Sequence, residues 1–353
     1  MIRILILGTG SIAQRHADRF GAIAGCEVVA AVDVDAARAA TFAERNKITH
    51  RFADLDTALA WNGFDAAVNS TPDAVHFPTT MRLLAAGKPV FCEKPLAVNH
   101  IDADAMANAA EAAGLINMVN LTYRDAPAIQ RAAQMVAAGA IGGIRHVSAS
   151  YRQSWLTANY WGDWHTDPRW LWRLSSAHGS TGALGDVGVH IVDFAMFGTG
   201  LEITGLQARM QIFDKAPGNA IGAYTFDVND SVAMTVQFSN NALGTIHLSR
   251  YATGHRNDLD LSIHGETGAL RIWADADSST LDVCLGADIH TQTWQRVACP
   301  PTPNNAERFV AALRSGVNGT PDFRRAAAVQ RVLDLCILSN QEGRWINVPP
   351  PNR

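Results

Sequence analysis

The sequence predicts an α/β N-terminal domain with a Rossmann-type doubly wound parallel sheet, and an α+β C-terminal domain with a large, mainly antiparallel open sheet. Three observations predict this. Short apolar runs alternate with Ala-rich helical segments as far as Asn120, a pattern typical of strands buried on both faces. A glycine-rich turn, "GTGSIA", directly follows the first run. Beyond Asn120 the chain changes to successive period-two strands. We place the boundary after residue 121, giving domains 1–121 and 122–353.

The N-terminal elements follow from the apolar runs and from the helical spacing between them. The predicted strands are Ile2–Leu7, Val28–Val32, His50–Phe52, Ala66–Asn69, Pro89–Cys92 and Ile116–Asn120. The predicted helices are Ile12–Phe20, Ala36–Asn46, His76–Ala86 and Ile101–Ala113.

The C-terminal domain opens with a helix over Pro127–Ala138 and the strand "IRHVSASYRQ". A Trp-rich irregular stretch and a short helix around Asp186–Phe197 come next. From Leu201 to about Ala298 the apolar residues alternate at period two, which predicts antiparallel strands. Helices over Asn305–Ser315 and Phe323–Asn340 close the domain.

The composition excludes several functional classes. The chain is 48% hydrophobic and 18% charged, with a net charge of −4. It has no basic run for nucleic acid and no apolar run long enough to span a bilayer. Five cysteines are scattered without CxxC spacing, so we expect neither a disulfide framework nor a metal site, and we expect a cytoplasmic protein.

The turn in "ILILGTGSIAQRH" has the G-x-G-x-x-A pattern between a strand and a helix. Gly8 allows the tight turn, Gly10 lets a pyrophosphate approach the backbone, and Ala13 permits close packing. Ser11 and Ile12 open the helix, whose N-terminus favours an anion. The pattern predicts a dinucleotide site; a tight turn without a ligand is the alternative.

Asp33 stands at the carboxyl end of the second strand. A carboxylate there accepts hydrogen bonds from ribose hydroxyls and repels a 2′-phosphate, which favours NAD over NADP. Arg38, one helical turn later, keeps NADP open as the less favoured cofactor.

Polar residues also end the fourth, fifth and sixth strands, where ligands of open α/β sheets bind. In "NSTPDAVH" such residues serve either the cofactor or the local backbone. In "GKPVFCEKPLAV" a glutamate and a lysine emerge beside the expected nicotinamide, although a solvated loop is the plainer interpretation. The residues assigned to the cofactor here are Ser70, Thr71, Pro72, His76, Glu93, Lys94 and Asn120.

A second constellation is "GALGDVGVHIVDFAMFG". Asp186 and His190 are four residues apart, so a helix places them on one face, and Gly188 between them suggests a close approach. A neutral histidine can take a hydroxyl proton, and a neighbouring carboxylate would orient it. Asp193 is expected to serve the helix or the domain contact. An Asp-His pair on a surface helix is the alternative.

These motifs together resemble the glucose–fructose oxidoreductase / inositol dehydrogenase / MocA family of pyridine-nucleotide sugar oxidoreductases. The matching pieces cover essentially the whole chain: "GTGSIA", "STPDAVH", "AAGKPVFCEKPLA", "TGALGDVGVHIVDFAMF" and "NQEGRWINVP". The resemblance implies that Lys94, Asp186 and His190 form the catalytic set, with the histidine as base and the lysine holding the reacting oxygen. It also implies a homodimer or homotetramer formed through the open face of the C-terminal sheet. Thr181 interrupts the glycines usual before the aspartate, which changes the loop more than the chemistry.

Substrate contacts are expected from "YRQSWLTANYWGDWHTDPRWLWR" and "NLTYRDAP". Aromatic faces pack on the C–H face of a sugar, although at least half of the tryptophans are expected to pack within the protein. No cluster of cations for a phosphate stands out, so a small neutral sugar or cyclitol is favoured. Besides the catalytic set, the assigned residues are Tyr123, Arg124, Arg152, Gln153, His165 and Arg173.

The leading hypothesis is an NAD-dependent dehydrogenase that oxidises a secondary hydroxyl of a sugar, inositol or related polyol. Redox-assisted glycoside cleavage or epimerisation with recycled NAD is the alternative at the same site. A non-catalytic NAD sensor is the third, and the intact Lys-Asp-His set speaks against it.

Overall fold

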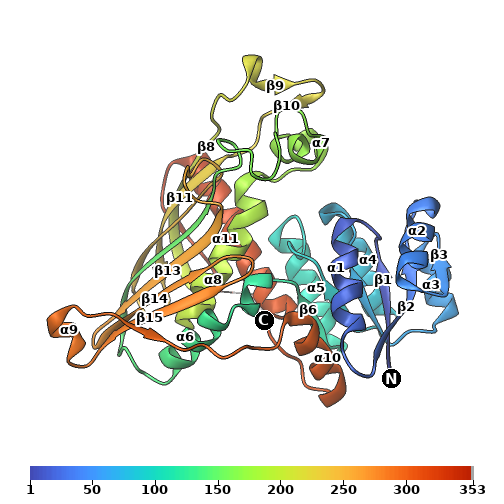
Figure 1. Cartoon of the computed structure of the whole chain (residues 1–353), viewed down its shortest axis with the longest axis horizontal. Helices are drawn as coiled ribbons and strands as arrows, with labels where there is room; N and C mark the ends of the chain where they lie inside the picture. Colours follow the sequence, from blue (N-terminus) through green and yellow to red (C-terminus); the bar gives the residue numbers. More distant parts are fainter. Residues whose placement is uncertain (351–353) are drawn as a thin grey trace. The chain divides into compact units, whose positions relative to one another are not determined.

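The computed structural model describes residues 1–350, which form two compact units. Unit 1 comprises Met1–Thr122 and Pro303–Gln330, and unit 2 comprises Tyr123–Thr302 and Arg331–Pro350 (Figure 1). The last helix, α11 (Phe323–Glu342), passes from one unit into the other. Within these residues no helix is long and apolar enough to cross a membrane.

Unit 1 is built on a six-stranded parallel sheet with the order β3-β2-β1-β4-β5-β6. Its middle strands are buried on both faces, as continuous apolar runs require. The strands are β1 (Ile2–Leu7), β2 (Cys26–Val32), β3 (His50–Phe52), β4 (Ala66–Asn69), β5 (Val90–Cys92) and β6 (Asn117–Val119).

The helices of unit 1 begin where side chains cap their free N–H groups. Asp35, Asp54 and Asn99 accept hydrogen bonds from the first turns of α2, α3 and α5. Helix α3 is absent from the sequence prediction because it has only seven residues. The helices are α1 (Ser11–Gly21), α2 (Ala36–Asn46), α3 (Leu55–Trp61), α4 (Asp73–Ala85), α5 (His100–Ala112) and α10 (Asn305–Ser315).

Helix α10 belongs to unit 1, although the sequence analysis assigns it to the second domain. Its Phe309 is fully buried and packs edge-on against Phe20 of α1 and Phe91 of β5, with ring centroids 6.3 and 5.5 Å apart. Ala306 and Val310 join the same core. The domains are therefore not the contiguous segments 1–121 and 122–353, because a distant segment completes the first core.

Unit 2 contains a nine-stranded sheet with the order β16-β15-β14-β13-β7-β12-β11-β8-β17. Its pairs are antiparallel except β7 with β12. The strands are β7 (Ile144–Gln153), β8 (Ile203–Gln211), β11 (Ser231–Phe238), β12 (Leu243–Ser249), β13 (Asn257–Gly265), β14 (Gly268–Ala274), β15 (Ser279–Leu285), β16 (Gln295–Val297) and β17 (Ile346–Asn347). The short strands β9 (Ala220–Ile221) and β10 (Tyr224–Thr225) form a separate hairpin.

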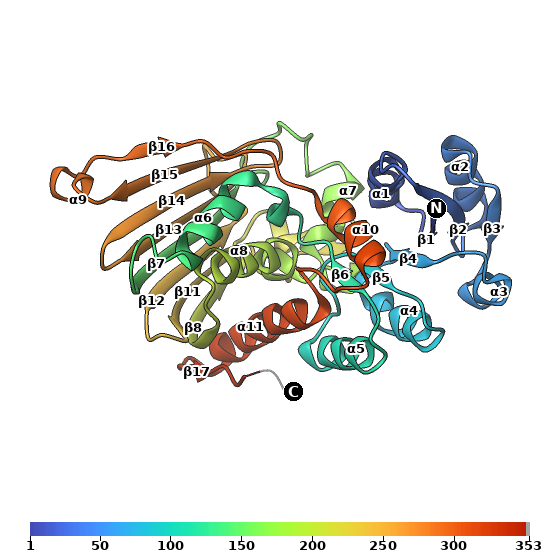
Figure 2. The same ribbon diagram turned by 90° about the horizontal axis from the view of Figure 1, so that it is seen from below.

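Helices α6 (Pro127–Ala137) and α8 (Val189–Thr199) cover one face of this sheet, as Figure 2 shows from below. The side chains beneath them are apolar and buried. This layer includes Met234, Val236, Leu259, Leu261, Ile263, Leu270 and Ile272. Elsewhere in unit 2 lie the short helices α7 (Pro168–Leu171) and α9 (Asp288–Thr291).

The other face of the sheet carries mainly polar side chains. Within β8 and β12 the buried apolar residues alternate with exposed polar ones, so residues such as Leu206 and Ile246 point to the covered face. The exceptions are exposed apolar side chains at Leu243 and, just after β8, at Ile212 and Phe213. The exposed side chains that pair across β8, β11 and β12 include Gln207, Arg209, Thr235, Thr245 and His247. This face gives no hydrophobic argument for an interface.

Candidate functional site

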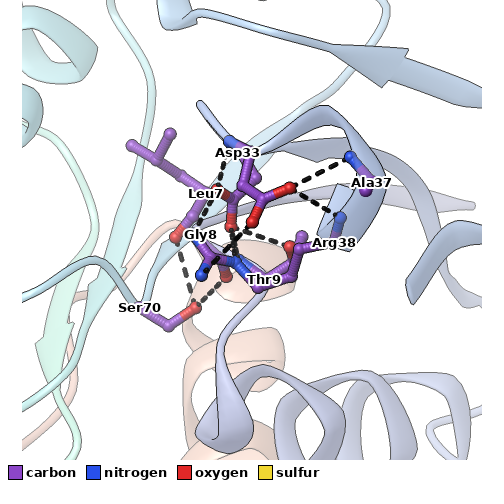
Figure 3. Close-up of polar contacts among 8 residues, drawn as sticks. Leu7, Gly8, Thr9, Asp33, Ala37, Arg38 and Ser70 are labelled. Atoms are coloured by element: carbon purple, nitrogen blue, oxygen red, sulfur yellow. Dashed lines mark hydrogen bonds and ion pairs between the residues drawn. The ribbon is translucent and has the colours of Figure 1, made fainter. Parts of the chain in front are cut away.

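The glycine-rich turn after β1 is held by the end of β4. Gly8 has a φ of +85°, and a Cβ there would lie 2.7 Å from the Ser70 carbonyl oxygen. The Ser70 hydroxyl donates to the carbonyl of Gly8 at 2.8 Å, as seen in Figure 3. Position 8 therefore requires glycine, because of its positive φ and because of the close approach of the Ser70 backbone. The Ser70 hydroxyl therefore stabilises the turn.

The N-terminus of α1 is open to a ligand. Gly10 is its N-cap without a side-chain hydrogen bond, and a Cβ on Gly10 would meet nothing within 4 Å. Gly10 and Ser11 are exposed, Ile12 is half-buried, and Ala13 is fully buried against the sheet. Unpaired N–H groups at such a terminus bind phosphate, so the turn fits a dinucleotide pyrophosphate.

Asp33, just beyond β2, is already bound within the protein. Its carboxylate accepts from the Thr9 backbone and hydroxyl, both at 2.8 Å, and from the Asp35 backbone at 2.9 Å. Arg38 donates two more hydrogen bonds. Burial by itself raises the pKa of the Asp33 carboxyl, but these donors outweigh it and lower the pKa well below its ordinary value.

After β4, the predicted cofactor residues make hydrogen bonds within the protein. The Thr71 hydroxyl donates to Asn69 at 2.7 Å, and Pro72 is the N-cap of α4. His76 is fully buried in the first turns of that helix. Its Nδ1 lies 2.7 Å from the Pro95 carbonyl and its Nε2 lies 2.8 Å from the Thr71 carbonyl. His76 therefore connects the loops after β4 and β5.

The loop after β5 combines an inward glutamate with a half-buried lysine. Glu93 is 8% exposed, and Asn120 donates to its carboxylate at 2.7 Å. Lys94 is half-buried, and its peptide bond to Pro95 is cis. The carboxylate also bonds His16 of α1, a residue that the sequence analysis does not select. His16 stands in the buried stripe of α1 with Ala13, Ala17 and Phe20, and a polar residue in such a stripe is a detectable signal.

In unit 2, Asp186 lies in a π-helical turn, η4 (Leu184–Gly188), that continues into α8. Such turns often occur at functional sites. The Asp186 carboxylate accepts from Arg173 at 3.0 Å and from the fully buried Arg250 at 3.1 Å. Leucine side chains approach Gly188 closely. A Cβ added at Gly188 would lie 3.1 Å from a methyl carbon of Leu184. Arg173 thus binds Asp186, and Arg250 is an unpredicted member of this group.

His190, in the first turn of α8, lies beside two tyrosines and is 7% exposed. The Tyr123 ring meets it edge-on at 5.1 Å. The hydroxyls of Tyr123 and Tyr151 are 2.7 Å apart, Tyr151 donates to Asn257 at 2.9 Å, and Asn257 donates back to Tyr123 at 2.9 Å. Burial raises the pKa of the Tyr123 phenol, which keeps it a neutral donor. The three groups close a hydrogen-bonded cycle next to the imidazole.

Gln153 joins this cycle, because its amide donates to Asn257 at 2.7 Å. Tyr151 and Gln153 are two residues apart on β7 and share a face. Tyr151 could therefore have been selected with Gln153 from the alternation alone. Asn257 is on β13, paired with Gln153, and no local signal indicates it.

The structure does not bring three predicted substrate residues to this cluster. Arg124 is 3% exposed and pairs with Asp193 through two hydrogen bonds of 2.6 Å, which gives Asp193 a role in anchoring α8. Arg152 points to the opposite face of β7 and pairs with Asp260. His165 is exposed and bonds the equally exposed Asp163 at 2.7 Å.

Most of the Trp-rich stretch packs on itself. Trp155 and Trp164 are buried in a cluster with Leu171, Leu174 and Phe226. Trp161 and Trp170 stack at 5.6 Å and lie against that cluster. Trp172 is 37% exposed, so it is the tryptophan of this stretch most available to a ligand.

Comparison with known proteins places both units. The description "Oxidoreductase family, NAD-binding Rossmann fold" matches residues 2–121, and "GFO/IDH/MocA C-terminal domain" matches residues 129–271. A levoglucosan dehydrogenase of Pseudarthrobacter phenanthrenivorans is 26% identical over 318 residues, 79% of each chain. An inositol 2-dehydrogenase of Rhizobium meliloti is 26% identical over 352 residues, 98% of this chain and 99% of that one.

Solved structures show the same fold. An oxidoreductase domain protein from Kribbella flavida has a TM-score of 0.85 at 28% identity, over 99% of both chains. A levoglucosan dehydrogenase in complex with NADH and L-sorbose has a TM-score of 0.87 at 22% identity, also over 99% of both chains.

Proposed function

Since the chain belongs to the GFO/IDH/MocA family of oxidoreductases, with an NAD-binding Rossmann domain, we propose that it oxidises a secondary hydroxyl of a sugar, inositol or related polyol. The observation that carries the proposal is the His190 cluster. It combines one buried imidazole with a cycle of neutral donors and acceptors, Tyr123, Tyr151 and Asn257. Such groups bind and deprotonate hydroxyls.

The cofactor site is proposed at the glycine-rich turn. Gly8, Gly10, Ser11 and Ile12 would hold the pyrophosphate, and Asp33 the adenosine ribose. Bound NAD supplies the acceptor for the hydride that leaves the hydroxyl-bearing carbon. Ser70, Thr71, Pro72, His76, Glu93 and Asn120 shape the loops beside it.

The proton is assigned to His190. A neutral imidazole accepts it from the substrate hydroxyl as the C–H bond is broken. Lys94 stabilises the negative charge that develops on that oxygen. Asp186, four residues before His190, is proposed to support the histidine, while Arg173 and Arg250 bind its carboxylate.

The ion pairs of the three arginines predicted to contact the substrate support a neutral substrate. Arg124, Arg152 and Arg173 each pair with an aspartate, so their charge is already compensated. The groups around His190 are hydroxyls and amides instead, which match the hydroxyls of a sugar or cyclitol. The named relatives act on levoglucosan and inositol, which agrees with this class.

The test is NADH formation measured by absorbance across a panel of sugars and cyclitols. We expect stoichiometric NADH with at least one neutral polyol, and we expect the His190→Ala variant to lose it. Product formation without net NADH would replace dehydrogenation by redox-assisted cleavage or epimerisation. Turnover by neither route on any polyol would reject the proposal.

We also propose a homodimer or homotetramer formed through the polar face of the unit 2 sheet, as the family resemblance implies. Sedimentation at micromolar concentration tests it, and a monomer would reject it. A cytoplasmic location is proposed because the five cysteines are all free thiols, which a reducing compartment preserves. Fractionation of cells tests that location.

A further inference from the structure

A buried histidine lies on the inner side of the lysine loop in unit 1. His16 of α1 is 1% exposed, and its ring packs edge-on against Phe91 at 5.5 Å. Its Nε2 lies 2.7 Å from Oε1 of Glu93. The same helix carries the proposed pyrophosphate site at its N-terminus. His16 therefore connects the cofactor helix to the loop that contains Lys94.

Glu93 transmits this contact to the backbone of Lys94. Its Oε1 accepts from His16 and from Asn120, each at 2.7 Å. Its Oε2 accepts the backbone N–H of Lys94 at 3.1 Å. One carboxylate thus holds the main chain of Lys94 on one side and two buried donors on the other. A displaced carboxylate would release the Lys94 backbone.

The hydrogen-bond geometry indicates which form His16 takes. Burial by itself raises the pKa of the Glu93 carboxyl, but the hydrogen bonds from His16 and Asn120 outweigh it and lower that pKa to about 2. An ionised carboxylate only accepts, so Nε2 of His16 carries a proton.

Packing alone does not explain an imidazole at this position. Nδ1 of His16 is buried and has no hydrogen-bond partner in the described chain. An unsatisfied buried polar atom is destabilising, and an apolar ring of similar size would avoid that cost. The gain that offsets this cost is the hydrogen bond to Glu93.

We infer that His16 is a positioning residue for Lys94: it fixes the Glu93 carboxylate, which in turn fixes the backbone of the lysine. The inference rests on the role proposed above for Lys94. Removing His16 leaves a buried carboxylate with fewer donors, so Glu93 shifts or takes up a proton and the Lys94 loop relaxes. A displacement of about 1 Å at a reacting group can cost roughly 100-fold in rate.

The experiment compares His16→Ala and His16→Gln with Phe20→Leu as the matched control. Phe20 is one turn further along α1, is fully buried and also packs on Phe91, at 5.5 Å, but has no polar group. Hydrogen exchange of the Lys94 amide is measured by mass spectrometry in the protein without cofactor. The turnover number kcat, the NAD dissociation constant and the thermal midpoint are measured in parallel.

We expect His16→Ala to speed exchange at Lys94 and to lower kcat by about 10- to 100-fold, with NAD affinity changed less than about threefold. His16→Gln keeps an N–H donor, so it should restore part of the slow exchange at Lys94 and part of kcat. Phe20→Leu should lower the thermal midpoint while leaving exchange at Lys94 and kcat near normal. Unchanged exchange in His16→Ala, or equal effects of Phe20→Leu, would overturn the inference.

The two proposals fail in different ways. If Lys94→Ala keeps normal turnover, the role proposed for the lysine is wrong, whereas the exchange result still decides whether His16 holds its backbone. If Lys94→Ala is inactive and His16→Ala is normal in both exchange and kcat, only the inference about His16 is wrong.

Discussion

The guanidinium of Arg38 donates to both oxygens of Asp33, from Nη2 at 2.7 Å and from Nε at 3.0 Å. The side chain of Asp33 is 4% exposed and that of Arg38 is 49% exposed. The proposed acceptor for the ribose hydroxyls and the cation nearest to a 2′-phosphate are therefore one ion pair. We therefore expect cofactor preference to depend on the pair and not on either residue alone.

The first prediction is that NAD binds more tightly than NADP and that Asp33→Ala reduces this preference at least about tenfold. The ribose loses a charged acceptor, and Arg38 becomes available to a phosphate. Titration of both cofactors by fluorescence measures the ratio. Arg38→Ala is the control, and it should not improve NADP binding. A wild type that prefers NADP would contradict the assignment.

The second prediction concerns the chemical step. His190→Ala and Lys94→Ala should each lower kcat by roughly two to four orders of magnitude, the usual scale for a lost general base or charge stabiliser. Both variants should bind NAD nearly as the wild type does, because the proposed dinucleotide contacts lie on the glycine-rich turn and Asp33. Near-normal turnover of His190→Ala on the true substrate would remove it from the mechanism.

The third prediction is an acid limb in the pH–rate profile. His190 must be neutral to accept a proton, so kcat/KM should fall as the pH is lowered and the imidazole is protonated. Steady-state rates from pH 5 to 9 measure it. The residual rate of His190→Ala should lack this limb. An acid limb of the same midpoint in that variant would assign it to another group.

The fourth prediction concerns the anchor of α8. Both partners of the Arg124–Asp193 pair are buried, so Arg124→Ala leaves an uncompensated carboxylate and should lower the free energy of unfolding by about 3–5 kcal/mol. Urea denaturation measures it. Adding Asp193→Ala should restore part of the loss, since the charge is removed. The exposed pair of Arg3 with Asp65 is the control, and Arg3→Ala should change stability little.

The fifth prediction uses His76, whose two ring nitrogens both face carbonyl oxygens. Burial alone lowers its pKa, but the Cys92 sulfur and the Pro95 carbonyl raise it to about 10 from the ordinary 6.5. The folded protein thus binds this proton more strongly than the unfolded chain. The stabilisation is present below about pH 6.5 and is lost as the pH rises towards about 10.

Urea midpoints measured across that range for the wild type and for His76→Gln test this. The wild type should lose more stability with rising pH than the variant does, because the variant has no proton to release. Parallel curves for the two proteins would show that His76 is not protonated in the folded state.

Much of the fold could be predicted because strands buried on both faces are continuous apolar runs. The order of residues along a strand also determines which side chains share a face. Arg152 and Gln153 are adjacent on one strand, so they must face opposite sides, and only Gln153 reaches His190's neighbours. The neutral cycle around His190 needs Asn257, which is more than a hundred residues from Tyr123 and Tyr151. No local pattern predicts such a partner.

The directions of the Glu93 and Lys94 side chains could not be predicted from the local sequence either. Glu93 and Lys94 are neighbours in the sequence, yet the carboxylate of Glu93 turns inward to His16 and Asn120. A side chain's direction depends on which donors the tertiary structure places around it, and local propensity does not contain that information. The site residues could therefore be selected from their residue type and their position after a strand. Their roles could not be predicted, because these depend on hydrogen-bond partners that only the tertiary structure brings close.

Because α10 packs in the core of unit 1, residues 1–121 do not form a complete domain when they are separated from the rest of the chain. A polypeptide ending at residue 121 would lack Phe309 and Val310, and would expose the apolar surface of Phe20 and Phe91 that they cover. Domain exchange between relatives would need two junctions instead of one. A chimaera that grafts residues 1–122 alone should aggregate, whereas one that also carries residues 303–330 from the same parent should keep its core.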